Sequence, residues 1–153
     1  MVAFFVLCGT VSAEPYASTP DVPKELEYRE RRIKSLEHVQ STIPDRSEIP
    51  IPPYPGSVVT NGIWEAGDYN VIQLVTNDTV DDVQTYYTQA LPDFNFAYKL
   101  MNPCFFKGPE ESFEPMQPGQ QLPYVMLTEV RPGGGDAELV PGAQTRVQIY
   151  YAP

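Results

Sequence analysis

The sequence has few of the side chains that most enzyme sites need. It contains one histidine, His38, and two cysteines, Cys8 and Cys104, in 153 residues. A Ser/His/Asp or Cys/His site would need that one histidine, and a zinc site of cysteine and histidine ligands has too few candidates. The glycine run at residues 133–135 lacks the Lys and Ser/Thr of a phosphate-binding loop, and no Cys-x-x-Cys-His haem attachment is present. We therefore expect no catalytic residue, no bound metal and no cofactor.

Positive charge is also scarce. Ten Lys and Arg face twenty Asp and Glu, which gives a formal net charge of −10. Residues 50–153 hold four of the former and twelve of the latter, so most of the excess lies in the C-terminal two thirds. An acidic surface repels phosphate backbones and anionic lipids, which excludes nucleic acid as the expected ligand. A cationic partner or simple solubility fits this balance.

Residues 1–13 are the one markedly apolar run at the N-terminus and carry no charged side chain. The run is too short for a membrane span, which needs about 20 apolar residues. Small residues up to Ala13 predict signal-peptide cleavage, although the basic n-region is missing and the natural start could lie upstream. Lipoprotein processing at Cys8 ranks lower because Leu7 is large, and a buried N-terminal strand or helix is the third alternative. We expect export, with the mature protein in the periplasm or at the extracytoplasmic face of a bacterial membrane.

After such cleavage one cysteine remains, and a single thiol forms no internal disulfide. That favours a bacterial envelope over a small, disulfide-stapled secreted domain. Cys104 precedes Phe105 and Phe106, so we interpret it as a small buried hydrophobe and not a nucleophile.

A helix is predicted at residues 80–91. Its apolar side chains follow the spacing i, i+3, i+6, i+7, i+10 and i+11, which places them on one stripe. Thr79 with Asp82 three residues on resembles a capping box, and Pro92 cannot continue the helix.

Alternating apolar residues on either side of this helix predict an antiparallel sheet. The strands are expected at residues 57–64, 69–76, 93–101, 104–107, 124–130 and 145–151. Asn102 and Pro103 are expected to break the chain between the third and fourth strands, and residues 108–122 to form a long loop. The fold class is thus α+β, with five or six antiparallel strands in the order ββαβ(β)ββ packed on one helix, in a domain at residues 57–153.

Residues 14–56 are expected to form an N-terminal extension. A charged helix at 23–41 is supported by Glu–Arg and Glu–Lys pairs at i,i+4, and its narrow apolar stripe either lies on its own domain or docks on another protein. The proline-rich arm at 42–56 favours polyproline II and could extend over roughly 45 Å, so it either wraps the domain or lies along a partner. We predict that a partner protein contacts Leu26, Ile33, Leu36, Ile49, Ile51, Tyr54, Tyr124 and Tyr150.

Acidic and aromatic clusters offer further candidates. Asp78, Asp81 and Asp82 lack the glycine and closing glutamate of an EF-hand loop, and helix capping accounts for them. The acidic loop around residues 110–114 is interpreted as a solvated charge run. Of the tyrosines, Tyr86, Tyr87 and Tyr98 are expected in or near the core, whereas Tyr54, Tyr124 and Tyr150 are expected to be freer for contacts.

The segment 54–91 resembles a pattern found in small exported bacterial α+β domains of unassigned function. The resemblance rests on Tyr54-Pro55-Gly56, a following strand pair and a threonine-capped helix with Tyr86-Tyr87. It implies an envelope location and a helix-on-sheet fold, and it carries no catalytic residues.

We therefore predict a non-enzymatic, exported accessory subunit of a larger bacterial envelope or membrane-bound complex, for example respiratory or photosynthetic, that docks through its N-terminal arm. The alternative is an envelope domain that binds a small ligand or carbohydrate in a cleft between helix and sheet.

Overall fold

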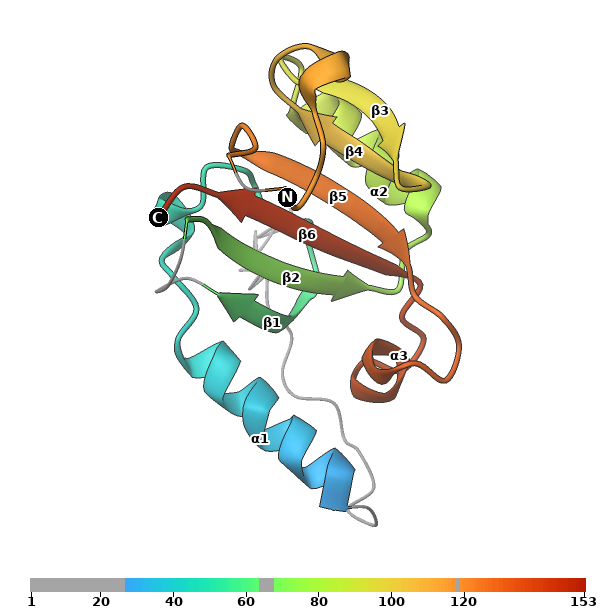
Figure 1. Cartoon of the computed structure of the whole chain (residues 1–153). Helices are drawn as coiled ribbons and strands as arrows, with labels where there is room; N and C mark the ends of the chain where they lie inside the picture. The colour runs from blue at the N-terminus through green and yellow to red at the C-terminus, as the bar shows by residue number, and fades with distance from the viewer. Residues whose placement is uncertain (1–26, 64–67, 118) are drawn as a thin grey trace, which may run out of the picture.

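The computed structural model describes residues 27–63, 68–117 and 119–153. Its centre is a six-stranded antiparallel sheet with the strand order β1-β2-β6-β5-β4-β3 (Figure 1). The strands are β1 (Val58–Ile63), β2 (Asn70–Thr76), β3 (Asn95–Lys99), β4 (Asn102–Phe106), β5 (Tyr124–Glu129) and β6 (Thr145–Tyr151). The last strand lies between β2 and β5, so it joins the two halves of the sheet. The predicted α+β class is confirmed. The predicted signal segment at residues 1–13 and residue 64 of the predicted first strand lie outside the described residues.

Helix α2 (Val80–Ala90) covers one face of the sheet. The predicted capping box is present, because the Thr79 hydroxyl accepts from the Asp82 amide and the Asp82 carboxylate accepts from the Thr79 amide. Val83, Tyr87 and Leu91 are buried in the same core as Val147, Ile149 and Tyr151 of β6. Sequence periodicity placed this helix correctly because both its ends and its stripe are encoded locally.

The opposite face is covered by the loop at residues 107–123 and by a short helix, α3 (Gly135–Leu139), which the sequence did not predict. In this loop the short η2 (Glu110–Ser112) precedes Phe113, whose ring stacks on Phe106 at 4.0 Å between centroids. The buried Asp136 of α3 accepts a hydrogen bond from Arg146 Nε at 2.6 Å. The five residues of α3 begin at the last glycine of the 133–135 run and are too few to show a helical period, so α3 depends on these tertiary contacts.

Helix α1 (Glu27–Ser41) lies beside β1, at one edge of the sheet (Figure 1). Leu36 and Val39 on its inner side are buried. The apolar stripe of α1 therefore contacts the chain's own domain, which is one of the two predicted alternatives.

The proline-rich arm contains the short η1 (Arg46–Glu48) and then packs into the core under α2. Ile49 and Ile51 are buried, at 6% and 0% exposure, in the same cluster as Tyr87. Burying one such side chain is worth about 1.5–3 kcal/mol, more than an extended solvated arm gains from its proline content. The expectation that residues 14–56 form an extension separate from the domain is therefore corrected for the described part, because the arm supplies core side chains.

The boundary between β3 and β4 also differs from the prediction. The break falls at Leu100 and Met101, and Asn102 and Pro103 begin β4. Asn and Pro are typical turn residues, so sequence reasoning placed the break there. The pairing of Lys99 with Asn102 instead leaves a two-residue hairpin loop made of two large apolar residues.

Candidate partner-binding site

Six of the eight residues predicted to contact a partner are covered by the chain itself. Leu36, Ile49, Ile51, Tyr54, Tyr124 and Tyr150 are each no more than 9% exposed. Ile33 is half-buried, and Leu26 lies outside the described residues. These six side chains stabilise the fold in this structure, so the predicted contact set is corrected.

The tyrosine prediction is confirmed for Tyr87, which is buried in the core, and for Tyr86, which packs against that core. It is wrong for the other four tyrosines that it named. The hydroxyl of Tyr54 donates to Asp78 Oδ2 at 2.7 Å, and burial together with this hydrogen bond raises its pKa. Tyr124 stacks on Tyr150 at 4.4 Å, and its hydroxyl accepts from the Met116 amide at 2.8 Å. Tyr98, which was expected in or near the core, is 62% exposed.

The cleft expected between helix and sheet is filled. Val83 and Tyr87 are fully buried and Leu91 nearly so, and the Tyr87 hydroxyl donates to the Pro52 carbonyl at 3.1 Å. The proline-rich arm occupies the remaining space beside them. The prediction of a ligand cleft between α2 and the sheet is therefore wrong.

The two edges of the sheet differ. The β1 edge has α1 beside it, whereas β3 is the last strand at the other edge (Figure 1). In a two-residue hairpin the closing pair, Lys99 and Asn102, is hydrogen-bonded, and bonded and non-bonded pairs alternate from there. The backbone N–H and C=O of Phe96 and Tyr98 therefore point away from β4. Phe96 and Tyr98 are 39% and 62% exposed on the same side of the strand. The strand has no proline, and Lys99 at its end is its one charged side chain of the kind that protects an open edge.

At the end of this strand the hairpin tip, which we define as Leu100 and Met101, has an unusual backbone. Both residues have positive φ, at 52° and 63°. A two-residue loop with two positive φ angles is a type I′ turn, for which Asn-Gly is the favoured sequence because side chains with a Cβ are strained there. Instead the tip carries two large apolar side chains that are 62% and 94% exposed. Backbone strain combined with exposed apolar surface is typical of functional positions.

A groove lies next to the tip because the sheet divides there. The nitrogen of Pro103 faces β5 but has no hydrogen to donate, and the β4–β5 pairs stop at Cys104 with Met126. Pairing of β5 with β6 continues to Glu129. The space left between the two strands is a groove of about 610 Å³.

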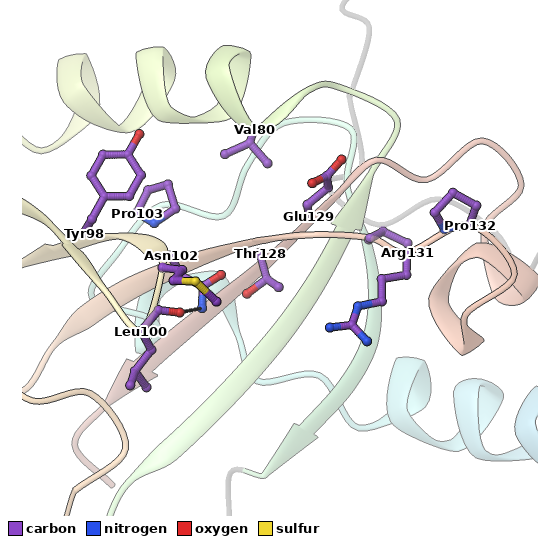
Figure 2. A pocket seen from close by; sticks show the side chains of 11 residues that line it. Val80, Tyr98, Leu100, Asn102, Pro103, Thr128, Glu129, Arg131 and Pro132 are labelled. Carbon is purple, nitrogen blue, oxygen red and sulfur yellow. Dashed lines mark hydrogen bonds between the residues drawn. The ribbon is translucent and has the colours of Figure 1, made fainter.

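Figure 2 shows how the groove is lined. Tyr98 and Pro103 stand at one end, Val80 of α2 above, Thr128 in the middle, and Arg131 at the other end. The tip and the groove together form a continuous surface from β3 to the loop after β5, with apolar and aromatic side chains over most of it.

Other chemical candidates are accounted for by the fold. Cys104 is buried, and burial raises the pKa of its thiol to about 11, so it is a poor nucleophile as expected. His38 is exposed on α1. Within the described ranges, no three histidine, cysteine or carboxylate side chains are grouped as metal ligands. In the same part of the chain no helix is long and apolar enough to span a bilayer.

Comparison with known protein families, with curated proteins and with solved structures finds no match for this chain. The candidate site therefore depends on the geometry alone.

Sequence reasoning missed the hairpin tip, although a signal was present. Phe94, Phe96, Tyr98 and Leu100 alternate along the chain, a pattern that predicts one face of a strand and no loop at Leu100. Between Phe94 and Met101 the sequence has no Gly, Pro or Asp that would mark a turn, and the first turn residues after Asn95 are Asn102 and Pro103. A pair of large apolar residues midway between Tyr98 and Pro103 was the indication of a strained, exposed loop.

Proposed function

We propose that this protein is a non-enzymatic, exported partner-binding module that attaches to a larger bacterial envelope or membrane-bound complex through the hairpin tip and the adjacent groove. The observation that carries the proposal is the tip itself. Leu100 and Met101 occupy backbone conformations that favour Asn and Gly, and they expose apolar side chains where polar residues would be more stable.

The N-terminal arm does not serve as the docking element in this proposal. Its apolar residues are already used in the core, and Tyr54 and Tyr87 hold it through hydrogen bonds to Asp78 and to Pro52. An accessory subunit needs a surface that remains available after folding. The described residues offer that surface at the β3–β4 end of the sheet.

The chemistry of the surface suggests the kind of contact. A protruding pair of Leu and Met side chains fits an apolar pocket on the partner, since flexible Met side chains adapt to irregular surfaces. The groove beside it, with Arg131 at one end and Glu129 near its middle, has a volume of about 610 Å³, enough for one or two partner side chains (Figure 2). The acidic net charge favours a partner whose surface is basic around such a pocket.

The experiment is a comparison of matched variants in recovery of one complex from envelope fractions. Leu100→Asn/Met101→Gly removes both apolar side chains and gives the turn its favoured sequence. Met116→Gly is the control, because Met116 is also exposed with positive φ but lies in another loop. We expect the tip variant to lose at least tenfold in recovery of the partner, and the control to retain it.

A photocrosslinker placed at position 101 should then label the same partner, whereas one at the exposed Gln89 of α2 should not. Equal recovery by the tip variant and the wild type would overturn the proposal.

A further inference from the structure

We infer that the β3 edge pairs with the β3 edge of a second copy of this chain, antiparallel about a twofold axis at Ala97. The inference does not rest on the proposed function, because it is argued from the outward backbone groups of the strand, although Tyr98 also lines one end of the groove.

The first argument is the hydrogen-bond parity of the edge. Asn95, Ala97 and Lys99 direct their backbone groups to β4, so Phe96 and Tyr98 direct theirs outward. A twofold axis at Ala97 places Phe96 opposite Tyr98 of the second copy, and Tyr98 opposite Phe96. Each such pair exchanges two N–H to C=O bonds, so the four outward groups of one copy meet four complementary groups of the other.

The second argument is side-chain complementarity. Phe96 and Tyr98 project on one side of β3, and their rings already contact each other edge to face at 5.4 Å between centroids. In the pair, each Phe ring lies across from a Tyr ring of the other copy, and cross-strand aromatic pairs stabilise antiparallel pairing. The two α2 helices then flank this four-ring cluster on the same face of a continuous twelve-stranded sheet.

The third argument is charge. Each copy carries −10, so two copies repel each other over most of their surfaces. The strand from Asn95 to Lys99 contains no carboxylate and one cation, and Lys99 of each copy approaches the turn that carries Asp93 of the other. The strand itself therefore adds no carboxylate to the contact, although the acidic η2 lies close by, since Lys99 Nζ donates to the Glu110 carbonyl at 2.9 Å.

The exposed aromatic area of β3 indicates how tightly the two copies should associate. Phe96 is 39% and Tyr98 62% exposed, and side chains of ~200 Å² leave roughly 200 Å² of aromatic surface per copy. Stable dimers bury about 1,200–2,000 Å² in total, so this pair should be weak and transient, with a dissociation constant of about 10⁻⁵ to 10⁻³ M. Salt should strengthen it, since screening reduces the repulsion between the two acidic copies.

The test is sedimentation equilibrium of the full chain at concentrations up to 1 mM. Tyr98→Pro removes the outward N–H of an edge residue without removing a bond to β4, and Tyr98→Thr is the control that keeps this N–H. We expect concentration-dependent dimers for the wild type, association within tenfold of it for Tyr98→Thr, and a monomer for Tyr98→Pro. A wild type that stays monomeric, or a dimer that Tyr98→Pro does not weaken, would overturn the inference.

A second measurement tests the register without proline. Phe96→Cys and Tyr98→Cys chains carrying different tags are mixed and oxidised, and non-reducing gels are used to count cross-linked species. Because the register pairs position 96 with position 98, the mixed disulfide should exceed either homodimer severalfold. Equal yields of all three species would contradict the register. Both chains also carry Cys8→Ser, and the buried Cys104 stays out of the reaction.

Discussion

Replacing the hairpin tip by Asn-Gly should make the protein more stable. Leu100 and Met101 hold φ angles of 52° and 63°, and a left-handed conformation costs a residue with a Cβ roughly 1–2 kcal/mol. Glycine removes this cost at position 101, but the greater entropy of the unfolded chain lowers the stability by about 0.5–1 kcal/mol. Asparagine tolerates the conformation at position 100. Because the two side chains are 62% and 94% exposed, little buried apolar contact is lost.

The expected sum for Leu100→Asn/Met101→Gly is an increase of about 1–2 kcal/mol in the free energy of unfolding, or roughly 3–6 °C in Tm for a chain of this size. Urea titration followed by Tyr fluorescence gives the free energy, and an unchanged slope with denaturant shows that the unfolded state is comparable.

The same reasoning predicts that the more stable variant binds its partner less well. If the free energy of unfolding falls or stays within 0.3 kcal/mol of the wild type, the tip stores no strain, and the argument for its function loses its basis. Met116→Gly, at a φ of 63°, is the reference for relief of strain without loss of the tip.

The remaining predictions concern the arm and the core. Ile51→Ala should lower the free energy of unfolding by about 2–4 kcal/mol in urea titration, because Ile51 is fully buried, and a loss under 0.5 kcal/mol would mean that the arm does not belong to the core. Tyr54→Phe should lower the free energy of unfolding by about 1–3 kcal/mol, since it removes the 2.7 Å hydrogen bond to the Asp78 carboxylate. Asp78→Asn should lower it by less. Additive losses in the double variant would show that the two side chains are not coupled. Burial raises the pKa of Cys104 to about 11 from an ordinary value of 9.0, so between these pH values the unfolded thiol binds fewer protons than the folded one. Stability present below pH 9 should therefore be lost as the pH rises towards 11; Cys104→Ala should lack this part of the decline, and an identical pH profile for the two proteins would contradict it.

The sequence predicts an element when the residues that define it lie close together along the chain. Helix α2 was predicted because its cap, stripe and terminating proline lie within fourteen residues, and the Thr79–Asp82 box forms as expected. Strands β2 and β6 were predicted because alternation shows which residues share a face. Burial of Cys104 followed from its two phenylalanine neighbours.

The site was not predictable in the same way. An apolar residue in an alternating strand is predicted to be buried. Only the strand order shows that β3 lies at the edge of the sheet, where Tyr98 is 62% exposed and donates its hydroxyl hydrogen bond to Gln84 of α2. The tyrosines of β5 and β6 seemed free by composition, yet the central position of β6 brings Tyr124 and Tyr150 together beneath the loop that contains Phe113.

The sequence by itself determined the α+β class, the capped helix and most strands, because hydrophobic period, capping and charge act between neighbours along the chain. Only the tertiary structure decided that the proline-rich arm fills the core and that the strained Leu100–Met101 tip remains outside it. The physical reason is that both outcomes depend on which surfaces segments distant in sequence cover. The arm gains its burial from α2 and the sheet, and β3 stays exposed because, among the described segments, no strand pairs with its outer side.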